Sequence, residues 1–436
     1  MIENVPGRED SLTATESQPD ARRLTLIFAS LFTLAHIGAF AACLPLLAIL
    51  VPLKAQQISP DSEASLLSWT ALVGAGVASI VNIASGALSD RTRSRFGRRR
   101  PWILGGAIAT IASYFAIWRA ATPAELIAAI ALFQVGFNIF LPALVALLPD
   151  EVPDERKGRM ASLMALGPPV GLGLGAALVG SEALTAGGRY VALAGLAICL
   201  TAPLLIFWRA RSATDVEGAH NVGIEGALAA PEMNVLPPPG PRQLQNFRLV
   251  WLSRLLTQLG VATSQGFLLL LVVNAVEKGA DFPSDSAQLI VSRLFLASTG
   301  VSVAVALAIG ALSDQVGSRQ LFVAASGALI GAGMAVIAAL PVWWGVFFGQ
   351  IVYGIGVGLY SSAEVALAAE MLPSRRDSAR DLGILNLGNT LPQALAPLLA
   401  LFLIDPSGDG FSALFAVGAA SAGVGGAVAL RIKNKA

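Results

Sequence analysis

Long apolar stretches, separated by short polar segments, recur along the whole chain. A helix needs about 20 mostly apolar residues to cross a bilayer, and twelve stretches approach or exceed that length. Runs of about ten residues that alternate between apolar and polar, typical of a membrane barrel, do not occur in the sequence. We therefore predict an all-α membrane protein with twelve transmembrane helices, at 24–52, 64–88, 101–119, 124–148, 159–181, 190–208, 247–273, 288–312, 320–340, 343–369, 382–404 and 411–430.

The composition supports this class. Hydrophobic residues make up 55% of the 436 positions and charged residues 13%, whereas soluble domains carry about 25% charged residues. The mean hydropathy is +0.69, which excludes a soluble enzyme, a disordered chain and a DNA-binding domain. With a net charge of +1, the chain has no excess charge for a nucleic-acid partner. The lipid bilayer is the expected surrounding.

Basic residues predict the orientation. If the N-terminus is cytoplasmic, the segments that fall on the cytoplasmic side hold most Lys and Arg, and the outer loops hold Lys54, Arg119, Arg189 and Lys278. Cytoplasmic loops carry this excess in membrane proteins. We predict cytoplasmic N- and C-termini in a multi-pass protein of a bacterial inner membrane. Residues 1–23 lack the short apolar core of a cleaved signal and are expected to form a cytoplasmic tail.

The chain is duplicated. The segment Gly86-Ala-Leu-Ser-Asp90 recurs unchanged as Gly310-Ala-Leu-Ser-Asp314, and Gly97 and Arg99 match Gly317 and Arg319. Repeated halves around a central site are typical of transporters whose halves rock to expose that site to each side in turn. We predict a tail at 1–23, a six-helix half at 24–209, a cytoplasmic linker at 210–245, a second six-helix half at 246–430 and a tail at 431–436.

The first copy of the repeated motif resembles a known family signature. Gly86-x3-Asp90-Arg91 followed by Phe96-Gly97-Arg98-Arg99-Arg100 is similar to the loop between helices 2 and 3 of the major facilitator superfamily. The string Ser89-Asp-Arg-Thr-Arg-Ser-Arg-Phe-Gly-Arg-Arg-Arg-Pro101-Trp102 resembles the glycoside–pentoside–hexuronide cation symporters and the plant sucrose transporters. The resemblance implies the major facilitator fold with two pseudo-symmetric halves, a cavity lined by spans 1, 4, 7 and 10, and cation-coupled sugar or glycoside symport.

The chain departs from that branch where coupling ions are bound. The sucrose transporters carry an aspartate and an arginine in span 4, at positions that hold Gln134 and Val145 here. The sodium-coupled melibiose-type carriers use aspartates in span 2, where this chain offers Trp69, Asn82 and small residues. The resemblance therefore leaves the coupling cation, proton or sodium, unassigned.

The duplicated motif is a candidate gate. Gly86 and Asp90 are one helical turn apart, so glycine would let a neighbouring helix approach while Asp90 lies among the arginines. Charge-assisted hydrogen bonds from this carboxylate would hold the cytoplasmic side closed. In the alternative reading, the arginines fix the topology and contact anionic lipid. The candidate gate residues are Gly86, Asp90, Arg91, Gly97, Arg98, Arg99, Gly310, Asp314, Gly317 and Arg319, with Asp150 and Glu370 as further partners.

Polar side chains inside the spans are candidate solute ligands, because each is costly in hydrocarbon. The alternative is that they join neighbouring helices by hydrogen bonds. The candidates are His36, Gln134, Asn138, Gln258, Gln350, Tyr353, Tyr360, Asn386 and Asn389.

Two ionisable residues are candidates for proton coupling. Glu364 lies far enough inside span 10 for desolvation to favour its protonated form, although a gate salt bridge would also explain it. His36, halfway along span 1, could carry a proton or be a neutral residue bonded across helices. Arg254 and Arg293 are expected to extend toward the membrane interfaces.

Prolines and glycines in spans 5 and 11, which match each other in the repeat, predict that both spans bend during transport. Pro168 and Pro169, followed by Gly171, Gly173 and Gly175, predict a kinked span 5. Pro392 and Pro397 predict the same for span 11.

These features favour a secondary transporter that works by alternating access. No phosphate loop with its lysine is present, which argues against an ATP-driven pump. No nucleophile–base pair or metal-ligand spacing appears, so we predict neither an enzyme nor a metal or cofactor. Cation-coupled sugar or glycoside symport by a monomer is the first hypothesis. Export of a small amphipathic metabolite or drug is the second, and a non-transporting receptor or assembly factor on the same fold is the third.

Overall fold

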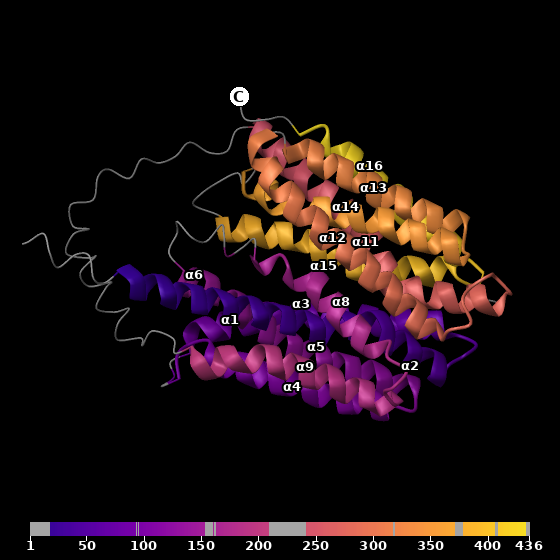
Figure 1. Ribbon diagram of the computed structural model, residues 1–436, viewed down its shortest axis with the longest axis horizontal. Helices are drawn as coiled ribbons and strands as arrows, with labels where there is room; N and C mark the ends of the chain where they lie inside the picture. Colours follow the sequence, from indigo (N-terminus) through magenta and orange to yellow (C-terminus); the bar gives the residue numbers. More distant parts are fainter. Residues whose placement is uncertain are drawn as a thin grey trace, which may run out of the picture.

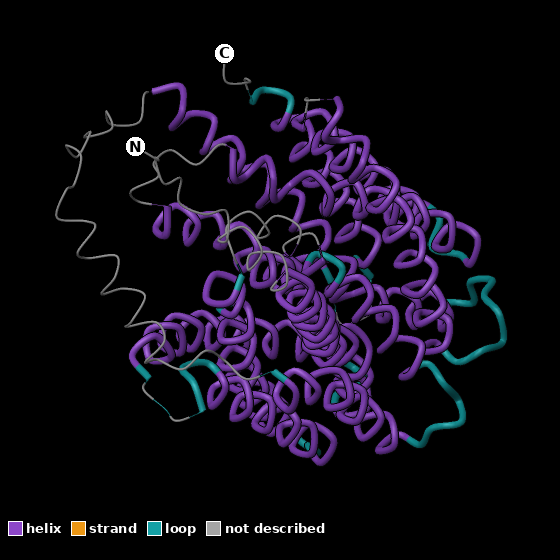
Figure 2. Tube along the Cα trace, turned by 60° about the vertical axis from the view of Figure 1, so that its left-hand side comes forward, coloured by secondary structure: helices purple, strands orange, loops and turns teal. Residues whose placement is uncertain are grey.

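The computed structural model describes residues 18–92, 94, 96–152, 160, 163–208, 241–316, 319–370, 378–405 and 409–432. These residues form helices joined by short loops, and none of the described residues lies in a strand (Figure 2). The all-α prediction is therefore confirmed. Ten of the helices are long and apolar enough to cross a membrane, and two shorter apolar helical segments lie at Gly167–Val179 and Leu387–Leu403.

The helices of the first part of the chain follow the predicted spans closely. Helix α1 (Gln18–Pro45) continues through a π-helical turn η1 (Leu46–Leu50) into α2 (Val51–Ile58), so the first span extends beyond its predicted end at residue 52. The π turn directly follows Pro45, which cannot donate the usual helix hydrogen bond. The helices that follow are α3 (Glu63–Arg91), α4 (Arg100–Arg119), α5 (Pro123–Val145), α6 (Leu147–Glu151), α8 (Gly167–Val179) and α9 (Ala186–Phe207).

The second part of the chain repeats this succession. Its helices are α11 (Pro241–Glu277), α12 (Ala287–Val316), α13 (Arg319–Ala339), α14 (Trp343–Glu370), α15 (Ser378–Leu403) and α16 (Phe411–Ala429). Most of the predicted linker lies outside the described residues, and its predicted end at residue 245 falls inside α11. The predicted division at 24–209 and 246–430 stays a prediction.

Span 5 is interrupted by a turn at Ala165 and Leu166, directly before its prolines. Pro168 and Pro169 do not bend the middle of a helix, because α8 begins at Gly167 and holds both prolines in its first turn. A first-turn residue has no intrahelical acceptor for its N–H, so proline costs little there. In α15, by contrast, Pro392 and Pro397 lie inside the helix as expected.

The helices pack in two groups (Figure 1). In the first group, α1 packs against α8 and α9, and α5 packs against α3 and α4. In the second group, α13 packs against α14 and α16, α11 against α15 and α16, and α12 against α14. The groups meet where α12 contacts α8, where α15 contacts α3, and where α11 contacts η1 and α2.

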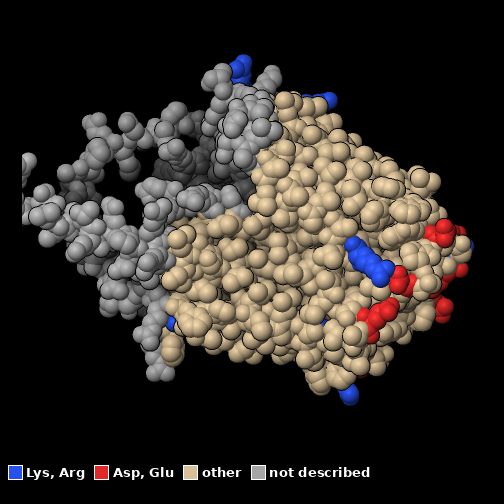
Figure 3. All heavy atoms as spheres, viewed as in Figure 1, with Lys and Arg blue, Asp and Glu red and all other residues tan. Residues whose placement is uncertain are grey.

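Two ends of the bundle can be distinguished. The motif end is the end where α3 finishes and α4 begins, and the opposite end is where α4 finishes and α5 begins. The contact between α8 and α12 extends to the opposite end of the bundle. A Cβ atom placed on Gly180, just after α8, would lie 2.4 Å from the Cβ atom of Ser292 in the second turn of α12. In Figure 3 acidic and basic side chains gather toward the right-hand end of the described surface, and most of the remaining face seen in this view is uncharged.

Glycine allows the closest helix contacts. A Cβ atom on Gly106 of α4 would lie 2.5 Å from the backbone nitrogen of Phe140 on α5, and a Cβ atom on Gly136 would lie 2.5 Å from the nitrogen of Thr110. Such distances leave no room for a side chain. Close backbone approach through small residues is the usual way in which membrane helices pack, and here it fixes the pairing of α4 with α5.

Adjacent glycines provide a direct test of this packing. We predict that Gly106→Ala lowers the free energy of unfolding by about 1–3 kcal/mol, because the new methyl group overpacks the α4–α5 contact. Gly105→Ala should be neutral or stabilising by up to about 1 kcal/mol, since a Cβ atom there meets nothing within 4 Å and alanine favours the helix. Thermal unfolding of the purified variants in detergent measures both, and equal effects would contradict the packing account.

Candidate functional site

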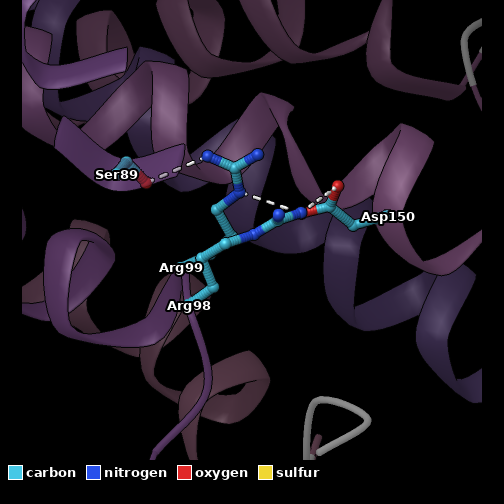
Figure 4. A network of polar contacts seen from close by, with 4 residues as sticks. All are labelled: Ser89, Arg98, Arg99 and Asp150. Carbon is cyan, nitrogen blue, oxygen red and sulfur yellow. Dashed lines mark hydrogen bonds and ion pairs between the residues drawn. The ribbon is translucent and has the colours of Figure 1, made fainter. Parts of the chain in front are cut away.

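The loop between α3 and α4 forms a polar network at the motif end (Figure 4). Arg99 donates through Nε to Oδ2 of Asp150 at 2.9 Å and through Nη1 to Oγ of Ser89 at 3.0 Å. Arg98 donates to the other carboxylate oxygen of Asp150 at 2.9 Å. The Arg99 residue is 8% exposed, so its charge is largely shielded from solvent. Asp150, predicted as a further gate partner, is thus an observed partner of two motif arginines.

The network joins helices of the same group. Ser89 lies on α3 and Asp150 on α6, while Arg100 donates to the backbone oxygen of Leu205 near the end of α9. The indole of Trp102 also donates to Thr92 Oγ1 at 2.8 Å. In this conformation the described contacts of these residues tie the motif ends of α3, α6 and α9 together. The gate hypothesis, which placed the closing hydrogen bonds on Asp90, stays a prediction because the Asp90 side chain lies outside the described residues.

Gly97 and Gly86 of the motif differ in backbone conformation and surroundings. Gly97 has a φ of +89°, a left-handed conformation that glycine adopts without strain, so it shapes the loop that presents the arginines. A Cβ atom on Gly86 would meet nothing within 4 Å. The expectation that Gly86 lets a neighbouring helix approach is therefore wrong. Arg91 is exposed at the end of α3, and Arg319 begins α13.

Some predicted site features lie outside the described residues. These are the side chains of Asp90, Asp314, Glu370 and Asn386, the surroundings of Gly310, and residue Gly317.

A second polar network lies inside the first group. Asn138 on α5 donates to Gln134 Oε1 at 3.0 Å, and its own Oδ1 accepts from Asn82 of α3 at 3.3 Å. Ser85 of α3 donates to the backbone oxygen of Asn138 at 2.7 Å. Gln134 and Asn138 therefore take part in joining α5 to α3, which matches the alternative reading of these two residues as interhelical contacts.

The third network contains a buried ion pair. Nη1 of Arg254 on α11 lies 2.8 Å from Oε1 of Glu364 on α14, and the two side chains are 15% and 9% exposed. Oε1 has no donor in hydrogen-bonding geometry, so the contact is electrostatic rather than a well-aligned hydrogen bond. Arg254 also donates through Nε to Oδ1 of Asn389 on α15 at 2.8 Å, and Gln258 donates to the same oxygen at 3.1 Å.

This arrangement differs from the sequence expectation for Arg254. Instead of extending toward the membrane interface, its guanidinium group links three helices. Gly388 makes room for it, because a Cβ atom there would lie 3.2 Å from Cδ of Arg254. Arg293, on α12, pairs with Asp285 near the opposite end. The sequence contained no signal for the pairing of Arg254 with Glu364, since the two are 110 positions apart and the rotation of each helix is set by packing.

The remaining candidates lie along α14 and α1. Gln350 is fully buried and donates to Ser264 of α11 at 3.1 Å. Tyr353 and Tyr360 are also buried on α14. His36 on α1 is 2% exposed, with its ring centroid 5.1 Å from that of Phe32, and its Nδ1 atom has no hydrogen-bond partner. The structure thus brings Gln258, Asn389 and Glu364 together with Arg254, and leaves His36 apart from them.

The Asp150 network leads to a stability prediction. Asp150→Asn should lower the free energy of unfolding by about 2 kcal/mol, because it removes the carboxylate charge that lies 2.9 Å from the buried Arg99 guanidinium group. Arg98→Gln should cost less than about 1 kcal/mol, because the Arg98 side chain is 48% exposed and exposed ion pairs contribute little. Thermal unfolding of the two variants compares them. If Arg98→Gln lowers the free energy of unfolding as much as Asp150→Asn does, this ranking is wrong.

Comparison with known proteins identifies the fold and the family. The fold resembles a peptide transporter POT in complex with alafosfalin (TM-score 0.64, 16% identity, 94% and 93% of the two chains covered). It also resembles a POT family transporter in complex with 5-aminolevulinic acid (0.66, 13%, 94% and 95%) and one in complex with a thioalcohol-conjugated peptide (0.67, 15%, 94% and 95%). No curated protein sequence matches the chain.

At these identities the solved structures show the fold alone, and the resemblance to the sugar-symporter branch stays a prediction. The family model described as Major Facilitator Superfamily matches residues 24–276 and 250–435, so it covers nearly the whole chain. The protein therefore belongs to the major facilitator superfamily and is a multi-pass membrane transporter, not an enzyme.

Proposed function

We propose that this transporter couples the entry of a proton to the uptake of a small polar solute, with a sugar or glycoside as the solute class. The observation that carries the proposal is the Arg254–Glu364 pair, because it joins two helices through a charge that a proton can remove. In this proposal the motif end faces the cytoplasm of a bacterium and the protein works as a monomer.

Protonation of Glu364 would change how α11, α14 and α15 are joined. The neutral acid no longer attracts the guanidinium group of Arg254, while the hydrogen bond from Arg254 to Asn389 of α15 persists. The link between α11 and α14 is thereby weakened and the link between α11 and α15 is kept. Among the acidic residues whose side chains are described, Glu364 is the one that is buried, so it is the natural proton acceptor.

The same geometry favours a proton over sodium. A sodium ion needs several oxygen ligands, and the guanidinium group 2.8 Å from Oε1 would repel it. A proton needs one carboxylate oxygen, and no donor is aligned for a hydrogen bond to Oε1 of Glu364, whose contact with Arg254 is electrostatic. We therefore infer proton rather than sodium coupling.

The solute class rests on neutral polar groups beside the pair. Gln258 and Asn389 bring amides to the place where Arg254 meets Glu364, and amides bind hydroxyl groups well. The resemblance of the α3–α4 loop to sugar symporters points to the same class. The peptide and 5-aminolevulinic acid named for the structural neighbours support small polar solutes in general.

One observation favours a second candidate, export of a small amphipathic metabolite. Gln134 and Asn138 are engaged with each other and with α3, so the first group has fewer free polar groups to offer a solute than the sequence indicated. A solute with an apolar portion would fit that side better.

Transport in liposomes tests the proton site. Under an inward proton gradient, we expect labelled disaccharides or monosaccharides to accumulate in the wild type. Glu364→Gln should abolish this accumulation and keep solute counterflow, because exchange requires no net proton movement. His36→Gln is the matched comparison, and accumulation should survive in it.

Two other outcomes would change the proton site or the direction of transport. Accumulation that survives in Glu364→Gln and is lost in His36→Gln would transfer the proton site to His36. Solute efflux against its gradient, with no proton-driven uptake, would favour the exporter.

Alternating access has its own test in the middle of the contact between α8 and α12. A Cβ atom on Gly173 of α8 would lie 3.3 Å from Cβ of Thr299 on α12, close to the separation of about 3.5–4.5 Å found in disulfides. In a chain carrying Cys43→Ser and Cys199→Ser, we expect Gly173→Cys with Thr299→Cys to cross-link on oxidation and stop transport. Reduction should restore it. Full transport by the cross-linked protein would mean that α8 and α12 do not need to separate.

A further inference from the structure

A small cavity lies against the Arg254–Glu364 pair. Its volume is about 10 Å³, near the smallest space that holds one water molecule. Four polar residues line it: Arg254 and Ser253 from α11, and Tyr360 and Glu364 from α14. Gln258 and Asn389, the amides of the proposed solute site, are not among the residues that line it.

Two buried polar atoms beside this cavity have no hydrogen-bond partner. They are the hydroxyl oxygen of Tyr360 and Oε1 of Glu364, and both residues are 7% exposed. Burying a polar group without a hydrogen-bond partner is costly, although Oε1 keeps its electrostatic contact with Arg254. Two such groups at one water-sized cavity are the usual setting of a bridging water. Because a tyrosine hydroxyl can both donate and accept, it can hold such a water against the carboxyl group.

Aliphatic side chains close the cavity toward the motif end. Val250 lies one turn before Arg254 on α11, and Leu367 lies one turn after Glu364 on α14. Val323 is near the start of α13, and Ile432 follows α16. All four are at most 4% exposed. The cavity therefore lies between the ion pair and the motif end, and an apolar seal separates it from solvent at that end.

We propose that this cavity binds one water molecule that joins Tyr360 to Glu364 and carries the coupling proton between Glu364 and the motif end, apart from the path of the solute. The proposal rests on the proton coupling proposed above. In the releasing direction the O–H bond of the protonated Glu364 breaks, and the water oxygen accepts the proton. Another proton of the same water then passes to solvent that enters past Ile432, which regenerates the water and leaves a carboxylate to pair with Arg254. Tyr360 is a positioning residue in this step.

Infrared difference spectroscopy of the purified protein tests the water directly. After a pH jump we expect the carboxyl band that Glu364→Gln removes to change together with a water band that shifts in ¹⁸O-water. Tyr360→Phe should remove the water band and slow the deprotonation of Glu364 by about tenfold. Tyr190→Phe is the matched control, since Tyr190 is also 7% exposed but lies in the first group, and it should behave as the wild type.

Transport by the same variants separates this role from a structural one. Tyr360→Phe should slow proton-driven uptake of the labelled disaccharide and leave its counterflow unchanged. Ile432→Ala, which opens the seal, should accelerate the deprotonation. An unchanged water band and rate in Tyr360→Phe would overturn the proposal, and so would an equal loss of uptake and counterflow.

The two proposals fail in different ways. Absence of proton-driven uptake in the wild type, with the water band and its dependence on Tyr360 present, would reject proton-coupled symport and keep the water site. Proton-driven uptake without a Tyr360-dependent water would reject the water site alone.

Discussion

A charged side chain inside the hydrocarbon core is costly unless its charge is neutralised nearby, and this constraint decides where the ionisable residues of this chain lie. On the face seen in Figure 3 the charged side chains gather toward the right-hand end, whereas the Arg254–Glu364 pair is buried between helices. Breaking one partner of such a pair costs several kcal/mol. In the proposed mechanism, a proton that neutralises Glu364 would therefore change the packing of α11, α14 and α15 more than the loss of an uncharged contact would.

The two charged networks have different consequences because they differ in what they join. Arg98 and Arg99 bind Asp150 within the first group, and in the proposed mechanism this network would keep three helices together as the groups rock. The Arg254 network links α11, α14 and α15 with charges that can be removed. Rigid groups and a switchable link are the two requirements of alternating access. The glycine contacts, such as Gly180 with Ser292, let the groups meet closely at the opposite end without a side chain to displace.

Hydropathy and duplication were enough to predict the helices, because each span must satisfy its backbone hydrogen bonds internally and so leaves an apolar run in the sequence. Asp150 was also predictable as a motif partner from its place at the end of span 4. Three other features could not be predicted from the sequence. The pairing of Arg254 with Glu364 depends on the rotation of two helices distant in sequence. The contact of Asn138 with Asn82 depends on the register of α5 against α3. The position of Pro168 depends on where α8 begins, which apolar composition does not define.

The central claim is that the charge of Glu364, held against Arg254, couples proton and solute movement. Its most direct test is a simultaneous measurement of proton and labelled-solute flux in liposomes that contain the wild type or the double variant Arg254→Gln with Glu364→Gln. Removing both charges avoids the cost of leaving one unpaired, so the double variant should remain folded. We expect the wild type to move protons with the solute and the double variant to move the solute downhill without protons. Proton movement that accompanies the solute in the double variant would contradict the central claim.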